Sequence, residues 1–209
     1  MKLPIYNLKA EKTGEITLPK VFSVSCSDAL ISQAIRVFTN NQRKSHAKAK
    51  DRGDITGTSA KMWPQKGTGR ARHSTAKAAQ FVGGGVAHGP TGDQNFKLEL
   101  PKKQKKLAIN SLLSKFAKNK EILILEDLSK IEPKTKIADK LIACLSTDNE
   151  VLSKSRRIGI ITSGVIENAK RAFNNLPGIE IINLNSLNIY NLSNKNFLII
   201  TKEAVNDIK

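Results

Sequence analysis

The chain has 209 residues, and its 35 Lys and Arg against 18 Asp and Glu give a formal net charge of +17. Such an excess is typical of proteins that bind nucleic acid and, less often, of proteins that bind an anionic membrane surface. No stretch approaches the roughly 20 consecutive apolar residues of a membrane-spanning helix, and we expect no signal peptide. Composition therefore argues against an integral membrane protein.

The two cysteines, Cys26 and Cys144, lie far apart in the sequence and form no ligand pair. A free cysteine is usually a small, buried, apolar residue, and reduced thiols are typical of cytosolic proteins. We therefore expect both to be reduced core residues of a cytoplasmic protein.

The first 40 residues predict short strands followed by one helix. Candidate strands cover residues 2–8, 15–18 and 21–24, the last two on either side of Pro19. Apolar residues then recur at helical spacing and predict an amphipathic helix over 28–39. They are Leu30, Ile31, Ala34, Ile35 and Phe38.

The composition changes over residues 41–96. This segment holds nine of the thirteen glycines, all three histidines and the only tryptophan, and its ten Lys and Arg face three Asp. A structureless stretch of this length is unusual inside a compact domain unless it is functional. We therefore predict an extended, basic, Gly-rich loop that projects from one globular domain made of residues 1–40 and 97–209.

Residues 61–72 show why this loop needs a partner. They have neither the helical nor the strand period, and their four cations meet no acid within the segment. Like charges on a flexible backbone repel each other and have no core to join. We expect residues 42–96 to be disordered in the free protein, with proteolysis starting between Lys44 and Lys77.

A helix is predicted over residues 101–118, because Pro101 suits a first helical turn and an apolar stripe follows it. Its first turn breaks a local rule, since lysines occupy the positive end of the helix dipole. They are Lys102, Lys103, Lys105 and Lys106. They are either solvated side chains or, as we favour, part of a phosphate-binding helix start.

The remainder of the chain alternates between strands and helices. The apolar runs 121–126 and 158–162 suit strands buried on both faces, and two further strands are predicted over 179–182 and 197–201. Helices are predicted over 135–145 and 165–173 and at the tail, and 186–191 is expected to be irregular. This alternation predicts an α/β domain with a mainly parallel sheet and helices on both faces, a three-layer αβα arrangement of Rossmann-like topology, carrying one long extended loop.

Motifs of enzymes with such sheets are missing. No Walker-type phosphate loop occurs, and Gly67-Thr68-Gly69 neither follows a strand nor opens a helix, as a dinucleotide fingerprint requires. Gly83-Gly84-Gly85 is similar to an oxyanion-hole turn, yet no Gly-x-Ser-x-Gly elbow accompanies it. Ser163 fits a helix cap better than a nucleophile. We predict no enzymatic activity and no cofactor.

The histidines do not indicate a metal site. His46, His73 and His88 are widely spaced and lack cysteine partners. In a basic loop they are better suited to stacking on bases or binding phosphates. We predict no bound metal.

The loop fits RNA better than duplex DNA. Lys and Arg supply phosphate contacts that release counterions, and Trp63, Phe81 and His73 can stack on unpaired bases. Glycines let the backbone approach the sugar–phosphate chain closely. Two alternatives stay open: a disordered tether that binds nonspecifically, and a membrane-surface segment, which would need a basic amphipathic helix that the loop lacks.

Three runs in the loop resemble the large-subunit ribosomal protein four family in its bacterial form. They are Trp63-Pro64-Gln65-Lys66-Gly67-Thr68-Gly69-Arg70-Ala71-Arg72, Gly83-Gly84-Gly85-Val86 and His88-Gly89-Pro90. The resemblance extends along the whole chain, through 43–57, 97–106 and 133–136. One departure is Pro64, where many bacterial members carry a basic residue; it removes a phosphate contact and stiffens the loop tip.

This resemblance implies a structural protein of the large ribosomal subunit that binds large-subunit ribosomal RNA and acts early in assembly. It also implies that the tip, residues 63–72, lines the nascent-peptide exit tunnel opposite ribosomal protein L-twenty-two. Some bacterial members of the family also repress their own operon, a secondary role that stays open for this chain. A loop of this length could reach about 90 Å at ~3.3 Å per residue. A nonspecific RNA-binding protein or chaperone outside the ribosome is the alternative.

Charge, aromatic character, glycine content and the resemblance together select the residues expected to contact ribosomal RNA. They are Arg43, Lys44, Lys48, Lys50, Arg52, Lys61, Trp63, Gln65, Lys66, Gly67, Thr68, Gly69, Arg70, Arg72, His73, Lys77, Phe81, Gly83, Gly84, Gly85, His88, Lys97, Lys102, Lys103, Lys105 and Lys106.

Overall fold

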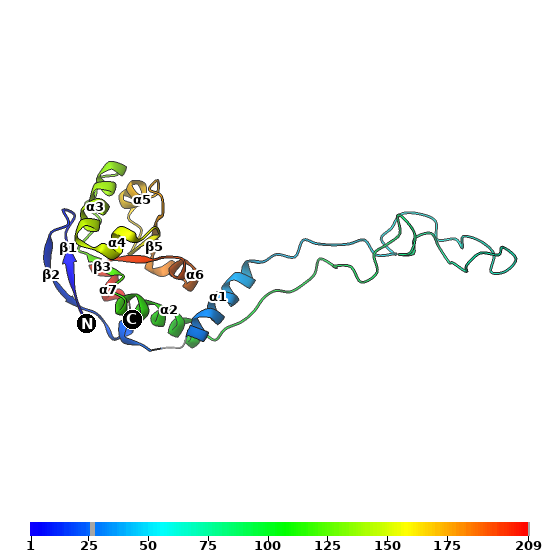
Figure 1. The fold of residues 1–209 in the computed structure, drawn as a ribbon, viewed down its shortest axis with the longest axis horizontal. Coiled ribbons are helices and arrows are strands. Elements are labelled where there is room, and N and C mark those ends of the chain that lie inside the picture. Colours follow the sequence, from blue (N-terminus) through cyan, green and yellow to red (C-terminus); the bar gives the residue numbers. More distant parts are fainter. Residues whose placement is uncertain (26–27, 209) are drawn as a thin grey trace. The chain divides into compact units, whose positions relative to one another are not determined.

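The computed structural model describes residues 1–25 and 28–208, so the expectation for Cys26 lies outside it. The chain divides into two compact units (Figure 1). The body comprises Met1–Thr39 and Glu99–Lys209, and the loop unit comprises Asn40–Leu98. No helix in the described part of the chain is long and apolar enough to cross a membrane.

The body is built on a six-stranded sheet with the order β2-β1-β3-β6-β4-β5. Its strands are β1 (Lys2–Tyr6), β2 (Lys12–Thr17), β3 (Ile122–Leu125), β4 (Ile158–Thr162), β5 (Ile179–Asn183) and β6 (Phe197–Thr201). The β1–β2 pair is antiparallel, and the other neighbouring pairs are parallel. The predicted mainly parallel α/β sheet is confirmed.

Helices fill all of these connections except the turn between β1 and β2, and one more helix follows the last strand. They are the 3₁₀ turns η1 (Lys20–Ser23) and η2 (Leu184–Ser186), with α1 (Asp28–Gln42), α2 (Lys102–Lys118), α3 (Thr135–Asp148), α4 (Glu150–Lys154), α5 (Glu167–Phe173), α6 (Ile189–Ser193) and α7 (Lys202–Asp207). Helix α1 runs three residues beyond its predicted end at Thr39.

Alternating side chains of the central strands supply two separate cores. On β3, Ile122 and Ile124 join the core beneath η1, α1, α2, α6 and α7, whereas Leu123 and Leu125 join the core beneath α3, α4 and α5. Strand β6 alternates in the same way. Figure 1 shows α3 and α5 on one side of the sheet and α2 and α7 on the other. Helices therefore cover both faces, which confirms the predicted αβα arrangement.

Two local predictions in the body were wrong because tertiary contacts and capping outweigh local pattern. The expected strand 21–24 overlaps the 3₁₀ turn η1, whose Phe22 is buried and whose Val21 carbonyl accepts a hydrogen bond of 3.0 Å from Ser114 Oγ on α2. The expected irregular segment 186–191 contains the start of α6. Its cap is Asn188, whose Oδ1 accepts the Asn191 N–H at 2.8 Å.

Two residue-level expectations also fail in the body. Cys144 is exposed, because Leu141 and Leu145 take the inward face of α3. Ser163 is not a helix cap: its hydroxyl donates to Glu203 Oε2 at 3.0 Å, and the cap position of α5 is Ile166.

Between α1 and α2 the loop unit contains turns, bends and one isolated antiparallel bridge, Lys48↔Thr91. Of residues 40–98, all of which the structure describes, Gly85 alone is buried. Hydrophobic burial therefore holds the body together, whereas the loop unit depends on the polar and close-packing contacts described next.

Candidate nucleic-acid interface

The two ends of the loop unit are joined by one side chain. Asn41 Nδ2 donates to the Leu98 carbonyl at 3.0 Å, and the Leu98 N–H donates to Asn41 Oδ1 at 2.8 Å. Next to this pair, the Arg43 guanidinium lies 4.3 Å from the centre of the Phe96 ring. A cation over an aromatic face is attracted by the ring quadrupole, so this arginine is held against the returning arm, which carries Phe96.

The two arms of the loop unit then run side by side. Beyond the bridge at Lys48, the Ala49 N–H donates to the Pro90 carbonyl at 2.8 Å, and the Val86 N–H donates to the Lys50 carbonyl at 2.9 Å. A Cβ on Gly89 would lie 2.7 Å from the Ala49 Cβ. A glycine is therefore needed at this close approach of the two arms.

Two glycines in the run of three are closely packed: Gly84 against its own arm and Gly85 against the opposite arm. The Gly84 N–H donates to the Phe81 carbonyl and the Gly85 N–H donates to the Lys77 carbonyl, each at 2.9 Å. A Cβ would lie 2.0 Å from the Ala78 carbonyl oxygen at Gly84 and 2.4 Å from a backbone nitrogen at Gly85. Internal packing therefore accounts for these two glycines without any contact to RNA.

The tip is a closed hairpin. The Met62 N–H donates to the Ser74 carbonyl at 2.8 Å, and the indole Nε1 of Trp63 donates to the Ala71 carbonyl at 2.9 Å. Gly67 and Gly69 have φ of +89° and +62° in the turn, a conformation that favours glycine. The exposed cations of the tip are therefore carried on a tight turn.

The aromatic residues predicted to stack on bases contact one another. The ring centres of Trp63 and His73 lie 5.7 Å apart and those of His73 and Phe81 lie 5.0 Å apart, both edge to face. The Arg70 guanidinium lies 5.7 Å from the centre of the Trp63 ring. Gln80 Nε2 and His73 Nδ1 share a hydrogen bond. These rings form a cluster inside the loop unit.

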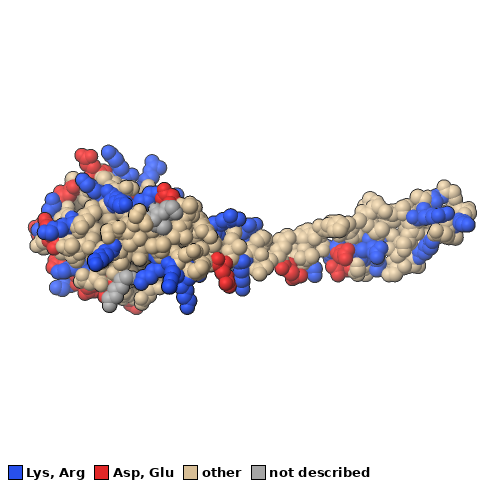
Figure 2. Space-filling model, turned by 90° about the horizontal axis from the view of Figure 1, so that it is seen from below, with Lys and Arg blue, Asp and Glu red and all other residues tan. Residues whose placement is uncertain are grey.

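The charge of the loop unit is not neutralised internally. It has eleven Lys and Arg against three Asp, with no acid between Asp54 and Asp93. The ion pairs among the described residues all lie within the body. Figure 2 shows Lys and Arg on the surface of both units. An anionic partner could therefore replace solvent around these cations without breaking an ion pair.

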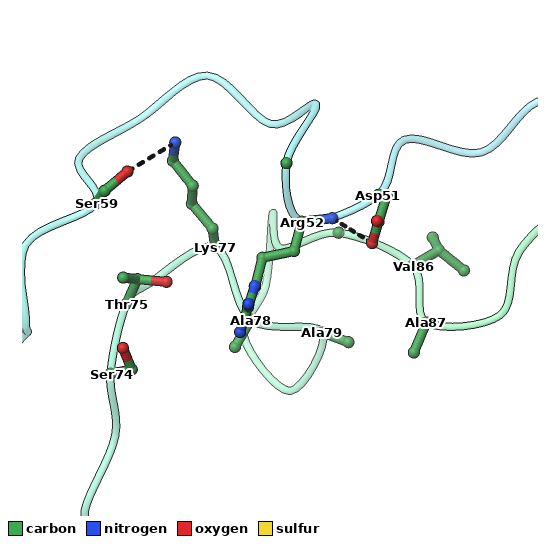
Figure 3. Close-up of a pocket in the computed structure, with 12 residues that line it drawn as sticks. Asp51, Arg52, Ser59, Ser74, Thr75, Lys77, Ala78, Ala79, Val86 and Ala87 are labelled. Carbon is green, nitrogen blue, oxygen red and sulfur yellow. Dashed lines mark hydrogen bonds between the residues drawn. The ribbon is translucent and has the colours of Figure 1, made fainter.

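One pocket of about 770 Å³ lies within the loop unit (Figure 3). Arg52 and Lys77 line it from opposite arms, and Lys77 Nζ donates to Ser59 Oγ at 3.4 Å. Ser74 and Thr75 add hydroxyls along one wall. Asp51 also lines the pocket, so its two cations face one carboxylate. The cations and the hydroxyls suit phosphate and sugar oxygens.

The body offers a second basic surface at the start of α2. Its first turn has no acid and no side-chain cap, and its four lysines are exposed. The N-terminal N–H groups of a helix favour anions, and lysines add to that preference. This geometry fits the predicted phosphate-binding helix start.

Most of the predicted contact residues are exposed, and Lys77, Trp63, His73 and Phe81 are half-buried. Sequence reasoning missed the pocket hydroxyls of Ser59, Ser74 and Thr75, and it missed Phe96 beneath Arg43. Only the Ser and Thr content of the arms pointed to such hydroxyls.

Over residues 1–25 and 28–208, no group of three His, Cys, Asp or Glu side chains could hold a metal ion.

Comparison with known proteins gives one consistent result. The model of the ribosomal protein L4/L1 family matches residues 16–209. Large ribosomal subunit protein uL4 of Natranaerobius thermophilus is 36% identical over 209 residues, which cover 100% of this chain and 97% of the relative. The proteins of the same name from Thermoanaerobacter sp. and Brucella anthropi are each 34% identical, over 98% of this chain and 95% and 96% of the relatives.

Proposed function

The chain belongs to the ribosomal protein L4/L1 family, and we propose that its loop unit binds large-subunit ribosomal RNA. Membership gives it a structural role in the large ribosomal subunit, a ribosome-bound place in the cytoplasm and a part in translation. The family is one of structural proteins rather than enzymes. Association with ribosomal RNA and with other proteins of the subunit follows from that role.

One observation carries the proposal for the loop unit. Its eleven cations form no ion pair within the described structure. Gly85 is its one buried residue, so the loop unit has no hydrophobic core. Phosphates would neutralise these cations and release counterions. The loop unit therefore has the charge and the missing core expected of a segment that completes its structure on RNA.

The geometry suggests three points of contact. The pocket between the arms would take a phosphate with Arg52 and Lys77, and its hydroxyls would contact the adjoining sugar. The tip would present Lys66 and Arg72 to phosphates that converge on it. The start of α2 would bind a further phosphate at its uncapped N–H groups.

The resemblance supports finer proposals. We propose that the tip, residues 63–72, lines the nascent-peptide exit tunnel opposite ribosomal protein L-twenty-two and meets the nascent peptide there. An early role in subunit assembly and repression of the protein's own operon belong to the same proposal. Its support is the tip run together with similarity over nearly the full length of the relatives.

Sedimentation tests the proposal directly. The tagged full chain, expressed in a bacterium, should travel with large subunits through a sucrose gradient at moderate salt. A variant with Arg52 and Lys77 changed to Gln should leave the large-subunit fraction at a lower salt concentration. Wild-type chain that stays at the top of the gradient would contradict the proposal.

The nonspecific alternative predicts a different competition result. If the chain binds RNA nonspecifically, transfer RNA and large-subunit ribosomal RNA should displace it from labelled RNA equally well when added at the same mass concentration. The ribosomal proposal predicts displacement by large-subunit RNA at a concentration at least about tenfold lower.

A further inference from the structure

We propose that Trp63 is a positioning residue that closes the tip hairpin and holds Arg70 in place, rather than a platform for an RNA base. This inference rests on the proposed function, because it assigns the tip cations to phosphates. It reverses the first interpretation of the single tryptophan in a basic loop, which was base stacking.

The polar atom of Trp63 is already used within the tip. Its indole N–H donates to the Ala71 carbonyl at 2.9 Å, spanning eight residues of chain. The neighbouring Met62 N–H donates to the Ser74 carbonyl at 2.8 Å. Together these two hydrogen bonds join the two ends of the tip hairpin. In each of them the donor lies at the beginning of the hairpin and the acceptor at its end.

The ring of Trp63 is engaged as well. Arg70 lies over it at 5.7 Å, and His73 meets it edge to face at 5.7 Å. A base that stacked on the face beneath Arg70 would have to displace that guanidinium and lose the cation–π attraction. His73 is in turn held by Phe81 and by Gln80.

These contacts have a consequence for binding. A flexible segment that orders on its partner loses conformational entropy at that moment, which lowers its affinity. A tip closed by Trp63 loses less, because Gly67 and Gly69 already adopt their turn and Arg70 already has a fixed neighbour. Trp63 thus acts through the cations that it positions.

The RNA-free protein gives the first test. Trp63→Phe keeps a ring but removes the indole N–H, whereas Trp63→Ala removes both. If the indole closes the hairpin, hydrogen exchange of the Met62 amide should be several-fold faster in both variants. Exchange as slow in Trp63→Phe as in the wild type would overturn the proposal.

Affinity for in vitro transcribed large-subunit ribosomal RNA gives the second test. Loss of one hydrogen bond predicts about a fivefold weaker affinity for Trp63→Phe, and Trp63→Ala, which also loses the ring beneath Arg70, should bind more weakly still. A base-stacking residue would instead tolerate phenylalanine, since every ring offers a face to a base. Near wild-type affinity of Trp63→Phe beside a weak Trp63→Ala would overturn the proposal.

A double-mutant cycle identifies the positioned cation. The loss of affinity caused by Arg70→Gln should shrink in the Trp63→Ala background, because the arginine has then lost its neighbour. Arg72→Gln is the matched control, since Arg72 lies over no ring among residues 1–25 and 28–208, and its effect should be the same in both backgrounds. Additive effects at Arg70 would overturn the positioning role.

Fluorescence adds an independent readout, because Trp63 is the only tryptophan in the chain. Positioning predicts little quenching when the ribosomal RNA binds, whereas a stacked base would quench the indole strongly, and strong quenching would overturn the proposal. If the wild-type chain binds no ribosomal RNA at all, the proposed function fails. Amide exchange in the RNA-free protein then still decides whether Trp63 closes the hairpin.

Discussion

The body and the loop unit differ in what stabilises their folded structure. The body buries two apolar cores and pairs some of its charges, as Lys115 does with Asp28 at 3.0 Å. The loop unit buries one glycine and pairs none of its cations among the described residues. The body should therefore be stable alone, whereas the loop unit should gain most of its stability from an anionic partner.

Salt should produce the largest effect, and it should act on the loop unit. If about eight phosphates are contacted, log affinity for ribosomal RNA should fall against log salt with a slope near −6 to −7. Raising salt from about 50 to 200 mM would then weaken binding roughly 10⁴-fold. Filter binding over that range measures the slope, and a flat response would reject the electrostatic account.

A cavity should produce the next largest effect, confined to the body. Phe173 on α5 is fully buried, so Phe173→Ala should lower the free energy of unfolding by about 3–5 kcal/mol. Urea denaturation followed by circular dichroism measures this loss. At a temperature where the variant remains folded, its salt slope for RNA should equal that of the wild type; a changed slope would show that the two units are coupled.

Glycine packing tests whether the loop unit has structure of its own. Gly85→Ala would place a Cβ 2.4 Å from backbone, whereas Gly53→Ala would meet nothing within 4 Å. We expect Gly85→Ala to speed proteolysis of the loop unit and weaken RNA binding several-fold, and Gly53→Ala to do neither. Equal behaviour of the two variants would mean that the arms are disordered in the free protein.

A smaller effect is expected at the Asp127 carboxylate, whose negative charge is stabilised by hydrogen bonds within the body. The backbone N–H and hydroxyl of Ser129 hold the pKa of Asp127 below its ordinary value. A lowered folded-state pKa adds stability above the unfolded-state pKa and loses it as pH falls through the folded one. Asp127→Asn should therefore cost less than about 1 kcal/mol at pH 7 and nothing in strong acid, as thermal melts at both pH values would show.

The smallest effect on folding is expected at the tip. Lys66→Glu reverses an exposed charge, so the melting temperature of the body should stay within about 1 °C of the wild type. Affinity for ribosomal RNA should nevertheless fall, because one phosphate contact becomes a repulsion. Loss of folding in this variant would show that the body depends on the tip.

The body was predictable because its signals are local and periodic. Continuous apolar runs such as Ile122–Leu125 indicate strands buried on both faces, and the alternation with helices then implies the layers. The failures occurred where one distant contact, one helix cap or the exact face of a helix decides. No residue near η1 in the sequence indicates the contact with Ser114. Cys144 is exposed because its neighbour Leu145 takes the inward position on α3.

The loop unit was predictable in charge but not in internal contacts. Counting cations and glycines identified the segment, yet the pairing of Trp63 with Ala71, or of Lys77 with Ser59, joins residues whose spacing follows no period. The same residue types suit RNA contact and internal packing, so the sequence could not say which glycines and aromatics serve the fold. Whether residues 41–96 form the RNA-binding part remains a prediction.

The pair formed by Asn41 and Leu98 has a consequence for how this chain can be altered. One amide joins the two arms where they leave the body, so the distance between them there does not depend on what lies beyond. Lengthening a flexible loop is inexpensive, about 0.6 kcal/mol for each doubling. Insertions between Gly67 and Gly69 should therefore leave the body folded, so a fluorophore placed there would report on the tip without disturbing the body.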